Sequence, residues 1–165
     1  MLQTMEIGTK GRKTAKVTAE NTAAALGSGM LEVFATPAMV ALIEATASES
    51  VASQLPEGQS TVGAHLGLAH SAPSPIGAEI VCETELIEVD RRRLVFKVQV
   101  SDGCGEIGSG THERFVVDDA RFMSKASSRL RSQLHDQHRE QQASAQNRPV
   151  CAECLRHGPD QRGYR

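Results

Sequence analysis

The feature that most constrains this fold is one long apolar helical stretch at residues 37–55. Aliphatic and small side chains fill nearly all of it, and Glu44 is a lone carboxylate in its most apolar part. Thr36 is a good N-cap and Pro37 suits the first helical position, while the Pro-Glu-Gly run at 56–58 ends the helix. A helix that is apolar nearly all round must be covered by other elements over most of its surface.

Predicted strands on both sides of the helix in the sequence can cover its surface. An edge strand is expected at 7–18, and four more runs follow the helix at 61–70, 78–89, 94–100 and 106–117. We therefore predict an α+β arrangement, in which an antiparallel sheet wraps around one long central helix.

Strict alternation along these strands predicts which side chains share a face. In the run 61–70 it places Val62, Ala64, Leu66 and Leu68 with His70, and Gly63 and His65 on the other face. In the run 106–117 it places Ile107, Thr111, Phe115 and Val117 together.

Charge divides the 165-residue chain near Ser124. Residues 124–165 carry eight Lys or Arg against four Asp or Glu, whereas the rest carries ten against sixteen. We expect a domain at 1–123 and a C-terminal segment at 124–165, helical and polar over 120–143 and disordered beyond Gln141.

Other function classes find little support. The sequence has no run of 18 apolar residues and no secretion signal, so we expect a cytoplasmic protein without a membrane span. The arginines at 91–93 read as a solvated turn, since aromatics make up only 3% and a nucleic-acid surface usually needs them for stacking.

The cysteines leave two interpretations open. Cys151 and Cys154 form a CxxC pair with His157 three residues on, which is either an incomplete zinc knuckle or a disordered tail with incidental thiols. Cys82 and Cys104 are expected to be reduced thiols. We predict neither a metal site nor a cofactor.

Three segments together carry a resemblance to a known family. They read VFATPAMVALIE at 33–44, VGAHLGLAHSAPSPIG at 62–77 and EIGSGTHER at 106–114. In this order and spacing they resemble the fluoroacetyl-CoA thioesterase family of hotdog proteins, over about residues 5–123. The resemblance implies a homodimer with sites at the subunit interface, and CoA enters only as part of an acyl-CoA substrate.

The same resemblance implies the site residues. Thr36, Glu44 and His70 match the catalytic set, and Gly63 and Arg114 match residues on the substrate side. The chemistry agrees: His70 can take a proton from water or from the Thr36 hydroxyl, and Glu44 can orient the imidazole or activate water. Gly63 lets backbone approach the thioester carbonyl, and Arg114 can hold a CoA phosphate or a carboxylate.

One departure bears on the substrate. The fluoroacetyl-specific member has aromatic residues before the catalytic threonine, where this chain has Gly27, Ser28, Gly29 and Met30. We therefore expect a thioesterase for a short or medium acyl-CoA, a range that leaves a fluoroacetyl-CoA-like substrate open.

Each site residue also has a structural alternative. Thr36 can serve as a helix cap, His70 as a satisfied core histidine, Glu44 and Arg114 as an ion pair, and Gly63 as a bulge. His65 and His112 are assigned to surface or structure. The rival functions are a non-catalytic acyl-CoA or small-ligand binding protein on the same fold, and an interaction protein whose CxxC tail binds zinc or a partner.

Overall fold

The computed structural model describes residues 5–146 and divides the chain into two units, 1–122 and 123–165. The first unit holds a short 3₁₀ turn at Ala19–Asn21, one long helix and five strands. The helix is α1 (Thr36–Val51), extended by a 3₁₀ turn at Ala52–Gln54. The strands are β1 (Lys10–Lys16), β2 (Gln59–His70), β3 (Glu79–Asp90), β4 (Arg93–Asp102) and β5 (Gly105–Asp118).

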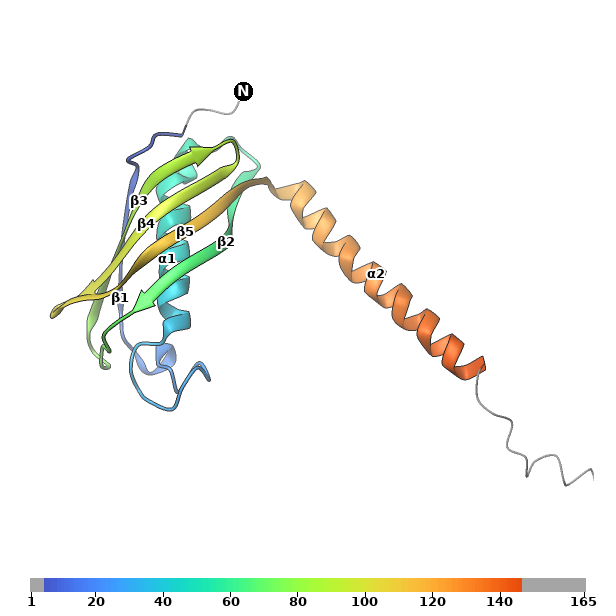
Figure 1. Cartoon of the computed structure of the whole chain (residues 1–165), viewed down its shortest axis with the longest axis horizontal. Coiled ribbons are helices and arrows are strands. Elements are labelled where there is room, and N and C mark those ends of the chain that lie inside the picture. The colour runs from blue at the N-terminus through green and yellow to red at the C-terminus, as the bar shows by residue number, and fades with distance from the viewer. Residues whose placement is uncertain (1–4, 147–165) are drawn as a thin grey trace, which may run out of the picture. The chain divides into compact units, whose positions relative to one another are not determined.

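The five strands form one antiparallel sheet that lies along α1 (Figure 1). The predicted α+β hotdog arrangement of sheet and central helix is therefore confirmed. The strand order is β1-β3-β4-β5-β2, so β2 pairs with β5 at one edge although β3 follows it in sequence. The segment 71–78 carries the chain from one side of the sheet to the other.

Helix α1 begins one residue earlier than predicted, at the residue that was expected to cap it. Ala35 is the N-cap residue and makes no side-chain capping bond, so Thr36 is the first helical residue and Pro37 the second. The capping role considered for Thr36 is thus wrong, and its hydroxyl is available for another partner. The inward side of α1 packs into an aliphatic core through Met39, Leu42, Ile43, Ala47 and Val51.

A bulge in β2 overturns the alternation expected there. The register with β5 shifts between Gly63 and His65, so Ala64 has no cross-strand partner. An extra residue reverses the side on which all later side chains lie. Gly63 therefore lies on the same, helix-facing side as His70, whereas alternation had placed the two on opposite faces.

Strand β5 shows a similar reversal. Its register with β4 shifts near Ile107, which is buried, and from there the inward row is His112, Arg114 and Val116. Phe115, expected on the core face, is 38% exposed. The prediction for this strand was wrong because one irregular residue exchanges the two faces.

The second unit contains most of helix α2 (Asp119–Gln146), which continues a few residues past the predicted end of the polar helix. Cys151, Cys154 and His157, and most of the predicted disordered tail, lie outside the described residues. Within the described part of the chain, neither helix has the length and hydropathy needed to cross a membrane.

Candidate active site

The N-terminus of α1 and the end of β2 meet at a threonine–histidine pair. Thr36 Oγ1 lies 2.8 Å from Nδ1 of His70, a hydrogen-bond distance. The other ring nitrogen of His70, Nε2, is buried and has no hydrogen-bond partner among the described residues. This imidazole is not a satisfied core histidine: it touches one hydroxyl and keeps a second nitrogen unused.

A pocket of about 280 Å³ opens beside this pair. Thr36, Ser71 and Ser28 contribute hydroxyl groups to its lining, and His70 contributes an imidazole. The rest of the lining is small or apolar: Ala23, Val33, Phe34, Ala72 and Pro73. Because its lining has no Lys, Arg, Asp or Glu, the pocket suits an uncharged apolar group placed next to a hydroxyl and an imidazole.

Glu44 lies further along α1, against β2 rather than against His70. A Cβ atom built on Gly63 would overlap Oε1 of Glu44 and would lie 3.3 Å from Cε1 of His112. Gly63 thus has room only for hydrogen on the side where these two side chains meet. The bulge that turns Gly63 toward the helix creates this contact.

Arg114 is buried behind that contact, with only 5% of its surface exposed. Its Nε donates to Thr61 Oγ1 at 2.8 Å, and its Nη2 donates to the Thr61 carbonyl at 2.7 Å. Its Nη1 lies 3.1 Å from Nε2 of His112. Burial lowers the pKa of Arg114, and the nearby Glu44 carboxylate opposes that shift.

His112 is the residue that sequence analysis missed. It is 1% exposed, and its Nδ1 lies 2.9 Å from the backbone carbonyl of His65. Burial lowers its pKa, Arg114 lowers it further, and the His65 carbonyl and Glu44 act in the opposite direction. The sequence left a surface and a structural role open for His112, and its burial excludes the surface.

Within one chain, the expected site residues form two groups. Thr36 and His70 make one, and Glu44, Gly63 and Arg114 make the other. Eight residues separate Thr36 from Glu44, which is roughly 12 Å along an α-helix. The expected site residues thus lie along one seam, at the contact between α1 and β2. Glu44 lies along that seam away from His70.

The buried histidine predicts a pH dependence of stability. Because the pKa of His112 lies below its ordinary value of 6.5, the unfolded chain binds a proton more readily than the folded one. The stabilising contribution is complete above pH 6.5 and is lost as pH falls toward the folded-state pKa. Burial is the largest cause of this shift, and the charged and titratable neighbours on each packed element, Arg114 (β5), Glu44 (α1) and His65 (β2), modify it.

We expect urea unfolding between about pH 5 and 8 to show a smaller loss of unfolding free energy on acidification in His112→Asn than in the wild-type protein. Equal pH slopes in the two proteins would contradict a depressed pKa at this position.

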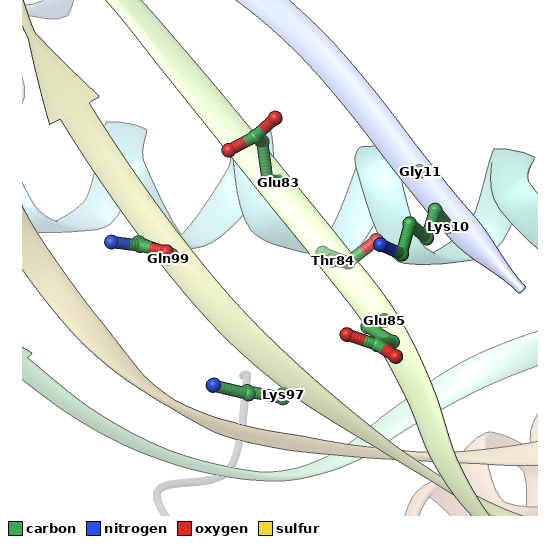
Figure 2. A pocket seen from close by; sticks show the side chains of 7 residues that line it. All are labelled: Lys10, Gly11, Glu83, Thr84, Glu85, Lys97 and Gln99. Carbon is green, nitrogen blue, oxygen red and sulfur yellow. The ribbon is translucent and has the colours of Figure 1, made fainter. Parts of the chain in front are cut away.

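A second hollow, of about 190 Å³, lies over β1, β3 and β4 (Figure 2). Lys10, Glu83, Glu85, Lys97 and Gln99 surround it, so it offers mixed charges rather than an apolar surface. It also lacks the hydroxyl–imidazole pair. Among the described residues, no group of three or more His, Cys, Asp or Glu is placed to hold a metal ion.

Comparison with known proteins points to one enzyme family. The family described as fluoroacetyl-CoA-specific thioesterase matches residues 17–120. The fluoroacetyl-CoA thioesterase of Streptantibioticus cattleyicolor is 40% identical over 94 residues, which span 57% of this chain and 68% of that protein.

Solved structures agree. The fluoroacetyl-CoA thioesterase FlK aligns with a TM-score of 0.72 and 33% identity, over 75% of this chain and 96% of FlK. An FlK variant crystallised with acetyl-CoA aligns with a TM-score of 0.73 and 32% identity, over 76% and 98%. A hot-dog-like protein from Thermanaerovibrio acidaminovorans aligns at 0.70 and 25%, over 76% and 93%.

Proposed function

Because this chain belongs to the family of fluoroacetyl-CoA-specific thioesterases, we propose that it hydrolyses a short or medium acyl-CoA to the free acid and CoA. The observation that carries the proposal is the Thr36–His70 hydrogen bond beside a pocket with an uncharged lining. Much of the pocket lining is small residues, and its volume of about 280 Å³ leaves room for an acyl group larger than fluoroacetyl. We place the protein in the cytoplasm, as its sequence predicts.

The reaction begins at the hydrogen-bonded pair. His70 takes the Thr36 proton at Nδ1 as Oγ1 attacks the thioester carbonyl, and the protonated imidazole then returns that proton to the departing CoA thiolate. Water next attacks the acyl–threonine ester: His70 takes a proton from the water and returns it to Oγ1 of Thr36 as the free acid leaves. The first turn of α1 places backbone N–H dipoles near the oxygen on which negative charge develops.

Glu44 and Gly63 enter this reaction through a homodimer. Thr36 and Ala41 on α1 are exposed, and β2 is an unpaired sheet edge next to them. A two-fold axis near Ala41 would place the α1–β2 seams of the two protomers side by side and antiparallel. In such an isologous contact, each end of one seam meets the opposite end of the partner's seam. Each Thr36–His70 pair would then meet the partner's Glu44 and Gly63. The carboxylate would orient the hydrolytic water, and the Gly63 N–H would bind the oxyanion.

The experiment that tests the proposed function is a hydrolysis screen over acyl-CoA thioesters from acetyl to octanoyl, with the released thiol detected. We expect turnover to peak at a short or medium chain and to fall for dicarboxylic acyl groups such as succinyl, whose charge finds no cationic partner in the pocket. Binding of acyl-CoA without thiol release would replace this proposal by the alternative, a non-catalytic binding protein.

Gly63→Ala tests whether the space beside the bulge is needed for turnover in a protein that still folds. The added methyl group would meet the far end of Glu44, a flexible side chain, so the protein is expected to fold with a small change in melting temperature. Turnover should fall about tenfold or more, because a displaced carboxylate no longer holds its water in line. Gly67→Ala, whose Cβ would find ordinary contacts at 3.7 and 4.0 Å, is the matched glycine control.

An unchanged turnover in Gly63→Ala, at normal folding, would remove both Glu44 and Gly63 from the proposed site.

A further inference from the structure

We propose that Arg114 and His112 are a buried positioning pair that ties β2 to β5 on both sides of the Gly63 bulge. This inference rests on the proposed function, because its purpose is to hold Gly63 and Glu44 where thioester hydrolysis needs them. It assigns His112 a role, and it gives Arg114 a role other than binding the phosphates of CoA.

Arg114 holds the strand before the bulge. Two of its nitrogens donate to a single residue, Thr61, one to the hydroxyl and one to the backbone carbonyl. Thr61 precedes Gly63 by two residues and lies on the same inward row. A guanidinium that bonds both the side chain and the backbone of one residue fixes the position of that strand and its rotation about the strand axis.

His112 holds the strand after the bulge. Its Nδ1 bonds the carbonyl of His65, the first residue that regains a cross-strand partner. A carbonyl only accepts, so the proton must be on Nδ1. Nε2 is then a lone pair, which suits the Arg114 Nη1–H donor at 3.1 Å.

The two side chains thus form one continuous chain of hydrogen bonds, from Thr61 through Arg114 and His112 to His65. The residues that it joins bracket Gly63, and His112 itself approaches the space beside Gly63 that Glu44 occupies. A bulge is an irregular and locally weak part of a ladder. Tying it on both sides keeps the inward face of Gly63 beside the Glu44 carboxylate.

The same contacts argue against a phosphate-binding role for Arg114. Its guanidinium is buried, and all three of its nitrogens contact protein atoms. A CoA phosphate could reach it only by displacing the residues that bury it. The cost of leaving buried partners unpaired makes that exchange unfavourable.

Substrates with and without phosphates distinguish a positioning role of Arg114 from a phosphate-binding role. Butyryl-CoA and butyryl-N-acetylcysteamine present the same thioester, but the second has no phosphate. We expect Arg114→Lys to lower kcat by about 10²-fold on both, the scale of an ångström-sized misplacement. A raised KM for butyryl-CoA alone, with normal turnover of the short thioester, would overturn the proposal in favour of phosphate binding.

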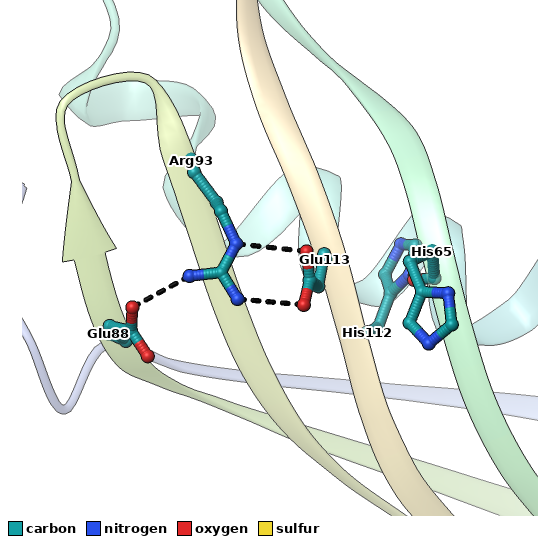
Figure 3. Close-up of polar contacts among 5 residues, drawn as sticks. All are labelled: His65, Glu88, Arg93, His112 and Glu113. Carbon is teal, nitrogen blue, oxygen red and sulfur yellow. Dashed lines mark hydrogen bonds and ion pairs between the residues drawn. The ribbon is translucent and has the colours of Figure 1, made fainter.

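Arg93→Lys is the matched control. Arg93 makes a bidentate pair with Glu113 and a further bond to Glu88 on the outer face of the sheet (Figure 3). Its replacement removes a similar fork without touching the bulge, so both substrates should turn over at the wild-type rate. A similar loss in Arg93→Lys would mean that Arg114→Lys reports a general weakening of the sheet.

Thr61 gives a milder test should Arg114→Lys fold poorly. Thr61→Val removes the hydroxyl that Arg114 Nε contacts and keeps the shape and the carbonyl. It is expected to lower kcat about tenfold on both thioesters, the scale of a lost hydrogen bond to a charged group. Thr61→Ser keeps the hydroxyl and should restore the rate. If valine and serine behave alike, the Thr61 contact does not position the site.

A spectroscopic signature tests the pair independently of activity. Nitrogen-15 NMR of the wild-type imidazoles should show His112 protonated at Nδ1 and uncharged at neutral pH, with its titration displaced below that of an ordinary histidine. Its Nε2 resonance should shift in Arg114→Lys. An Nε2-protonated or freely titrating His112 would overturn the pair even in an active enzyme. A correct tautomer in a protein that hydrolyses no thioester would instead refute only the proposed function.

Discussion

Replacing His70 by alanine is expected to lower kcat for acyl-CoA hydrolysis by about 10²-fold or more while the protein remains folded. The imidazole bonds only Thr36 among the described residues, and its Nε2 has no partner, so its removal breaks one hydrogen bond. The loss should therefore appear in turnover and not in the melting temperature.

The threonine variants complete this test. Thr36→Ala should approach the His70→Ala rate, because the two residues act as a unit and such losses do not add. Thr36→Ser should keep much of the activity, since it retains the hydroxyl. Thr111→Ala is the control, an exposed threonine on the outer face of β5. Full activity in folded His70→Ala would show that the chemistry lies elsewhere.

Mass spectrometry after a rapid quench distinguishes the role of Thr36. An acyl group on Thr36 marks it as the nucleophile. An acyl-free enzyme during turnover would instead mean that His70 activates water directly and that Thr36 only orients the imidazole.

Mixing two inactive variants should restore activity, because each proposed site takes residues from both copies. His70→Ala and Glu44→Ala are each expected to be nearly inactive alone. In a mixed dimer, one site receives both substitutions and the other receives neither. Random exchange makes half of all dimers mixed, so about a quarter of the wild-type activity should return.

The separation of the two groups within one chain motivates this experiment. Thr36 bonds His70, whereas Glu44 contacts Gly63 roughly 12 Å away along the helix. Mixing His70→Ala with Thr36→Ala is the control, because those residues meet within one chain and both mixed sites would be defective. Recovery in the control, or none with Glu44→Ala, would contradict a site shared in this way.

The family and the core arrangement were readable in the sequence. A single helix that is apolar nearly all round, followed by four strand signals, admits few arrangements other than a sheet against that helix. The resemblance of three short segments to the thioesterase family pointed to Thr36, Glu44, Gly63, His70 and Arg114 as candidate site residues, because local motifs can be read from the sequence alone. The type and order of elements depend mainly on such local patterns.

Only the tertiary structure decided which of these residues meet. The bulge at Ala64 and the register shift near Ile107 each exchange the inward and outward faces of one strand. A single irregular residue of this kind leaves no periodic signal in the sequence. These reversals turn Gly63 toward Glu44 and bury His112 beside Arg114. The same geometry keeps Glu44 from His70 within one chain, since their separation is set by the rise of a helix and its packing against β2.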